Sequence, residues 1–222
     1  DNFEEKRKVG ENDNYICEII RKDSIEEFII LVTKKNLKLT QKVEHSIFET
    51  NSFLIMKEPT LIEYAAFFGS IQIFKYLFNN NVELTPSLWI YGIHSDNPEL
   101  IHLLVENHVE PEIKSYEMCL LESIKCHHND IANYIQNNFL STKFKLNNNE
   151  KIFQYYNYMF FPNDLNQNFT FYYLCKYNYY TLVELLLMMK SIDINSKIIF
   201  TIFCFLIKFQ KYFQKFIKFQ PK

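Results

Sequence analysis

Glycine and arginine are scarce in this chain of 222 residues. The three glycines are Gly10, Gly69 and Gly92, and the two arginines are Arg7 and Arg21. Asn, Lys, Ile, Phe and Tyr are abundant instead. The abundant residues have A/T-rich codons and the scarce ones G/C-rich codons, so the bias indicates an A/T-rich genome rather than a particular function.

Strong net charge and long hydrophobic runs are also missing. The formal charge is −2, and acids are interspersed with most of the bases, so we expect no nucleic-acid partner. The longest apolar run, 198–207, ends at Lys208 and falls short of the roughly 18 residues that a membrane-spanning helix needs. Residues 1–14 are mostly polar and the five cysteines are widely spaced, a combination that predicts a reducing, cytoplasmic location.

The chain has no G-x-S-x-G, P-loop or kinase motif, so we predict that it is not an enzyme. Cys119, Cys126, His127 and His128 are the best candidates for a metal site. Zinc motifs combine two closely spaced ligand pairs, and this group lacks the second pair. We therefore expect core thiols and turn histidines here, with no metal and no cofactor.

Internal self-similarity is what the sequence does contain, and it is clearest in residues 60–84. The small pair Ala65–Ala66 lets a neighbouring helix approach closely. Gly69 suits the left-handed C-cap of a first helix, and Ser70 suits the N-cap of a second. Apolar residues then recur at helical spacing, at Ile73, Phe74, Leu77 and Phe78. The segment is predicted to be a helix pair that buries its apolar stripe against neighbouring pairs.

Four other segments fit the same template: 87–111 and 118–140, and more weakly 14–39 and 169–195. The stretches 40–59 and 141–168 are additional to the pattern, and the sequence leaves open whether they are helix pairs or loops. Residues 1–13 form a polar N-terminal segment. The pattern predicts an all-α chain, a solenoid of stacked antiparallel helix pairs over 14–195.

The pattern resembles the ankyrin repeat. Thr60, Ala65, Ala66 and Gly69 stand in register with the family's T-P-L-H-x-A-A-x-x-G signature, and 192–195 resembles its closing D-V-N. The chain is similar in particular to the large divergent ankyrin families of parasitic protists. It departs from the signature at Leu61 and Glu63, and its spacing is irregular. The resemblance implies an ankyrin-like solenoid that binds proteins.

The resemblance also implies a binding row on the concave surface, formed by the two residues that follow the Ala-Ala position in each unit. We expect this row to bind a protein partner, with the aromatic members as apolar anchors and the basic members as complementary charges. We expect the protein itself to be a monomer. Carried over by position, the row is Arg21, Lys22, Phe67, Phe68, His94, Ser95, Lys125, Cys126, Lys176 and Tyr177.

The C-terminal segment 196–222 has six lysines and no acid. Its apolar residues recur at alternating steps of three and four, which predicts an amphipathic helix. Such a helix could cap the open end of the stack. Two alternatives remain: a membrane surface as partner, which would make the chain a peripheral membrane adaptor, or a degenerate repeat product without a specific function.

Overall fold

The computed structural model describes residues 2–112, 115–141, 150–162 and 168–188. The regular secondary structure of this part of the chain is helical, with no β-strand and only an isolated bridge between Lys42 and Thr60. The all-α prediction is therefore confirmed for it. The predicted C-terminal helix 196–222 and the D-V-N-like residues 192–195 lie outside the described residues. The chain divides into two compact units, Asp1–Leu140 (unit 1) and Ser141–Lys222 (unit 2).

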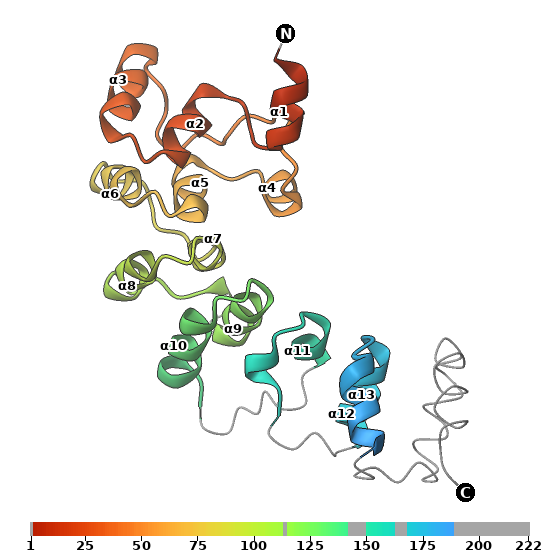
Figure 1. Ribbon diagram of the computed structural model, residues 1–222. Coiled ribbons are helices and arrows are strands. Elements are labelled where there is room, and N and C mark those ends of the chain that lie inside the picture. The colour runs from red at the N-terminus through yellow and green to blue at the C-terminus, as the bar shows by residue number, and fades with distance from the viewer. Residues whose placement is uncertain (1, 113–114, 142–149, 163–167, 189–222) are drawn as a thin grey trace, which may run out of the picture. The chain divides into compact units, whose positions relative to one another are not determined.

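Unit 1 consists of short helices, which Figure 1 labels in chain order. They are α1 (Phe3–Val9), α2 (Tyr15–Arg21), α3 (Ile25–Lys35), α4 (Ser52–Lys57), α5 (Leu61–Phe68), α6 (Ile71–Asn79), α7 (Leu88–His94), α8 (Pro98–Glu106), α9 (Tyr116–Lys125) and α10 (Asn129–Phe139).

Eight of these helices, α2 to α10 except α4, form four successive pairs. Helices α2 and α3, α5 and α6, α7 and α8, and α9 and α10 contact each other within pairs. Between pairs, α2 contacts α5, α5 contacts α7, and α7 contacts α9. Figure 1 shows the first helices in one row and the second helices beside them. The stretch 40–59, left open by the sequence, holds the single short helix α4 rather than a helix pair.

The apolar stripes predicted from the sequence form the core of unit 1. Ile73, Phe74 and Leu77 of α6 are buried, while Phe78 is only partly buried. Ala65 and Ala66 have no exposed surface. Their small side chains allow α5 to contact both α2 and α7, which is the close approach expected of this pair.

A left-handed residue recurs at the turn between the two helices of each pair. In the α2, α5, α9 and α12 turns, the next amide donates to the carbonyl five residues earlier, as in a Schellman motif. Glycine adopts this conformation without strain, and Asn or Asp tolerates it. The residues are Asp23, Gly69, Asp96, His127 and, in unit 2, Asn178, with φ between 49° and 68°. The predicted C-cap role of Gly69 is confirmed.

In the second, third and fourth pairs of unit 1, the residue after the left-handed position bonds to the preceding pair. Ser70 Oγ donates to the carbonyl of Ile20 at 2.5 Å, and Asn97 Nδ2 donates to that of Gly69 at 3.3 Å. His128 Nδ1 lies 2.6 Å from the carbonyl oxygen of Ile93. These bonds come from three different residue types at equivalent positions and link each helix pair to its neighbour.

The predicted N-cap of α6 is confirmed in position but not in its hydrogen bond. Ser70 occupies the N-cap position of α6, but its side chain makes no capping hydrogen bond because its hydroxyl is committed to Ile20. The carboxylate of Asp23, from the previous pair, accepts instead. Its two oxygens each lie 3.0 Å from a donor, the amides of Gln72 and Ile73. Helix α6 is thus capped by a residue about fifty positions earlier in the chain.

This shared cap gives a testable stability prediction. Asp23→Ala keeps a Cβ in the left-handed region but removes the capping carboxylate, so the free energy of unfolding should fall by about 1 kcal/mol or more. Asp23→Gly also removes the carboxylate but relieves the strain of a left-handed Cβ, so it should cost less. Urea denaturation followed by circular dichroism measures both. Equal stability of the alanine variant and the original chain would contradict the capping role.

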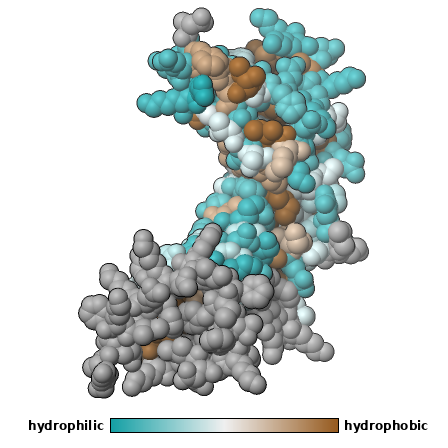
Figure 2. Space-filling view, turned by 90° about the vertical axis from the view of Figure 1, so that its right-hand side faces the viewer, coloured by the Kyte–Doolittle hydropathy of each residue, from teal (hydrophilic) through white to brown (hydrophobic). Residues whose placement is uncertain are grey.

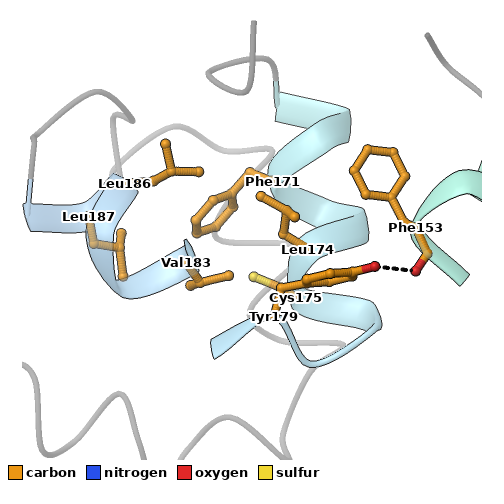
Figure 3. Close-up of a cluster of buried hydrophobic side chains, with 8 residues drawn as sticks. All are labelled: Phe153, Phe171, Leu174, Cys175, Tyr179, Val183, Leu186 and Leu187. Carbon is orange, nitrogen blue, oxygen red and sulfur yellow. Dashed lines mark hydrogen bonds between the residues drawn. The ribbon is translucent and has the colours of Figure 1, made fainter. Parts of the chain in front are cut away.

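Unit 2 has α11 (Glu150–Gln154), a 3-10 helix η3 (Tyr158–Phe160), α12 (Asn168–Lys176) and α13 (Tyr180–Met188). Figure 3 shows its buried cluster, in which Phe171 on α12 is directed toward Val183 and Leu186 of α13. The Tyr179 hydroxyl donates to the carbonyl of Phe153 at 2.7 Å and joins the α12–α13 pair to α11. The helix pair predicted for 169–195 is therefore present as far as its described residues extend.

Candidate functional site

The residues predicted to bind a partner occupy equivalent backbone positions. In each helix pair, the two predicted residues directly precede the left-handed turn residue, at the C-terminal end of the first helix. In unit 1 these helix ends belong to α2, α5, α7 and α9, which contact one another in that order. Lys176 and Tyr177 have the same position at the end of α12 in unit 2. The residues that the sequence pattern aligned with one another therefore occupy equivalent positions at the helix ends.

Five of the predicted residues form a continuous row of contacts in unit 1, which we call the ladder: Arg21, Phe68, Phe67, His94 and Cys126. The Arg21 guanidinium carbon lies 5.9 Å from the Phe68 ring centroid. The rings of Phe68 and Phe67 meet edge to face at 5.0 Å, and Phe67 stacks on His94 at 4.9 Å. His94 Nδ1 is 3.5 Å from Cys126 Sγ. All five side chains are partly buried.

Arg21 is held in place from both sides. Its Nη1 donates to the Tyr64 hydroxyl at 2.7 Å, and its Nε lies 2.9 Å from a carboxylate oxygen of Glu11. Burial raises the pKa of Tyr64 above its ordinary value, so this phenol stays protonated. The guanidinium therefore keeps a fixed position over Phe68, with only part of its surface open to solvent.

Lysines and one serine border the ladder. Lys22 pairs with Glu18 at 2.6 Å and Lys125 with Glu122 at 2.7 Å, and both lysines are exposed. Ser95 turns inward: its hydroxyl donates to the carbonyl of Gly92 at 2.7 Å. Within the predicted row, the Ser95 hydroxyl is therefore occupied by a hydrogen bond within its own turn. Figure 2 shows hydrophobic residues, in brown, gathered on the face of unit 1 that carries the first-helix row, between polar ones in teal.

Phe53 is a member of this surface that the sequence analysis missed. It comes from α4, within the stretch 40–59, and its ring lies 5.9 Å from that of Phe67, 4.5 Å from His94 and 5.1 Å from Tyr91. Phe53 therefore covers part of the ladder, and Phe67 is less open than the sequence suggested. Periodicity could not reveal this contact, because α4 does not belong to a repeat.

The cysteine and histidine residues that the sequence placed in one candidate metal group lie in different surroundings in the structure. Cys119 is fully buried in the core, and burial raises its pKa to about 12. His128 lies against the carbonyl of Ile93. Cys126 instead lies beside His94 and close to Glu122, which the sequence analysis did not select. Burial raises the pKa of the Cys126 thiol to about 11, and the nearby Glu122 charge contributes to the increase.

Glu122 lies between two basic side chains. Its Oε1 is 3.0 Å from His94 Nε2 and 2.7 Å from Lys125 Nζ. Burial by itself would raise the pKa of this carboxyl, but the contacts with His94 and Lys125 outweigh it and lower the pKa below its usual value. Glu122 is thus an ionised, partly buried carboxylate at one end of the ladder.

In unit 2, the predicted residues lie against Glu150 of α11. Lys176 Nζ is 2.6 Å from Glu150 Oε1, and the Tyr177 hydroxyl donates to the same oxygen. Both contacts lower the pKa of Glu150, with the Lys176 hydrogen bond as the larger cause. This group links α11 to the end of α12.

Comparison with known proteins does not assign a family to this chain. No protein-family model, no curated protein and no solved structure matches it. The ankyrin resemblance therefore depends on the sequence pattern alone. Across the described ranges, none of the helices combines the length and the apolar character that crossing a bilayer requires.

Proposed function

We propose that unit 1 is an ankyrin-like solenoid of four helix pairs, and that it works as a non-enzymatic module that binds a protein partner along the ladder. Repetition supports the fold proposal: every pair has the same left-handed turn, and every pair after the first is bonded to its predecessor at an equivalent position. Repeat proteins of this kind bind partners over an extended surface built from equivalent positions.

The ladder is the single observation that carries the binding proposal. It combines two phenylalanines, a histidine and an arginine in direct contact across three neighbouring helices. Aromatic and arginine side chains supply most of the energy in protein interfaces, particularly when their neighbours hold them rigidly. Lys22 and Lys125 at the border would attract an acidic partner and affect the association rate more than the affinity.

Partner capture from a native cell extract tests this proposal. One variant carries Phe67→Ala; a second carries Lys22→Glu and Lys125→Glu. A matched control carries Lys34→Glu and Lys35→Glu, the same charge change on exposed lysines at the end of α3, away from the ladder. Each variant must first show the thermal transition of the original chain.

A protein captured by the original chain and the control should be lost from the Phe67→Ala variant and captured more slowly by the lysine variant. With that partner purified, Phe67→Ala should weaken binding about 30-fold, as expected for an anchor worth roughly 2 kcal/mol. The lysine variant should mainly slow association, and the difference should shrink at high salt. Equal binding by all variants would place the binding site elsewhere.

A further inference from the structure

Three potential ligand side chains converge where α7 and α9 meet. His94 is the last residue of α7, whereas Glu122 is in the last turn of α9 and Cys126 is its C-cap. One ligand atom from each of the three lies within 4.8 Å of the other two. Glu122 and Cys126 are four residues apart, so they share one face of α9 and turn together toward His94.

The spacing of the ligand atoms is slightly wider than that of a tetrahedral zinc site. Zn²⁺ bonds of about 2.0–2.3 Å place neighbouring ligand atoms roughly 3.3–3.6 Å apart. An imidazole gives one ion only one of its two nitrogens, and the short distances involve both: His94 Nδ1 lies 3.5 Å from Cys126 Sγ, and His94 Nε2 lies 3.0 Å from Glu122 Oε1. With one ligand atom from each residue, the three atoms lie within 4.8 Å of one another, so the side chains must close in further around an ion.

His94 adds an independent indication. Its Nε2 atom is buried and has no hydrogen-bond partner, because the approach of Glu122 lacks hydrogen-bond geometry despite the short distance. Buried polar atoms in folded proteins are nearly always satisfied. A metal ion would satisfy this imidazole and would also use the carboxylate that faces it.

We propose that His94, Glu122 and Cys126 bind a Zn²⁺ ion that links the α7–α8 pair to the α9–α10 pair. Thiolate, imidazole and carboxylate are each zinc ligands, and water would complete the fourth position. On binding, a Zn–S bond forms and the Cys126 thiol proton leaves to the solvent. This reverses the expectation from sequence, where no second ligand pair accompanied Cys126. The ligands come from two repeats, so no local motif records them.

Lys125 is the competitor for this site. Its ammonium shares Glu122 Oε1 at 2.7 Å, and its side chain is nearly half exposed. The lysine can therefore swing into solvent when the ion binds, but its charge opposes the metal. Lys125→Ala should tighten Zn²⁺ binding by several-fold. If Glu122 were not a ligand, this substitution would leave the Zn²⁺ affinity unchanged.

Titration of the full chain with Co²⁺ and then Zn²⁺ tests the proposal, because a cobalt–thiolate bond gives a charge-transfer absorption in the near ultraviolet. We expect one Co²⁺ per chain, displaced by Zn²⁺. Cys126→Ser should abolish the band, and His94→Gln or Glu122→Gln should weaken binding by at least about tenfold. Glu117→Gln, an exposed change on the same helix, should leave the affinity unchanged.

Zinc should also raise the melting temperature of the original chain, and this shift should disappear in Cys126→Ser. Circular dichroism checks that each variant is folded without metal. The proposal is overturned if the folded chain shows neither a cobalt–thiolate band nor a thermal shift with excess metal. It is equally overturned if the band survives in Cys126→Ser, because another cysteine would then be the ligand.

Discussion

Replacing Trp89 by alanine is expected to lower the free energy of unfolding of unit 1 by about 3–5 kcal/mol. Trp89 lies on α7, has no exposed surface and packs edge to face against Tyr116 and Phe139. Its indole nitrogen also donates to the carbonyl of Val109 at 2.6 Å. The alanine variant loses this contact area, leaves a cavity and deprives a buried carbonyl of its donor.

Chemical denaturation followed by far-ultraviolet circular dichroism measures this loss. Trp89→Phe is the matched control, because it retains a buried ring but removes the N–H donor. It should cost less than the alanine variant, with about 1–3 kcal/mol from the unsatisfied carbonyl. A stability loss below 1 kcal/mol for Trp89→Ala would show that α7 does not pack against α9 and α10 as described.

Replacing Phe171 by alanine should have an effect of similar size in unit 2, about 3–5 kcal/mol. Phe171 is fully buried in the cluster formed by α11, α12 and α13 (Figure 3). Unit 2 is the smaller of the two compact units, and its described residues contribute a buried cluster of eight side chains. A loss of this size removes much of the stability that such a core supplies.

The single tryptophan makes the two units distinguishable by experiment. Trp89 is the only tryptophan in the chain, so tryptophan fluorescence reports unfolding of unit 1. Phe171→Ala should shift part of the circular dichroism transition to lower denaturant and leave the fluorescence transition nearly in place. Tyr172→Ala, at the half-buried next position, should cost less. Equal shifts in both signals would mean that the two units unfold as one.

The sequence by itself determined the helical class, the pairing of helices and the positions of the turns. Apolar spacing placed the stripe of α6, and Gly69 identified a turn because only glycine enters the left-handed region without cost. The same register located the turns at Asp96 and Asn178, where no glycine is present. These features are local: each depends on residues within one helix pair, and local patterns record them.

Only the tertiary structure decided which groups meet across pairs. The Asp23 carboxylate caps α6, Phe53 covers Phe67, and Glu122 joins His94 and Cys126. Each contact joins residues 28 to 50 positions apart or involves a helix outside the repeats. Such contacts depend on how neighbouring pairs stack, because side chains distant in sequence approach only when the helix ends are aligned. Periodicity within one pair carries no information about that alignment.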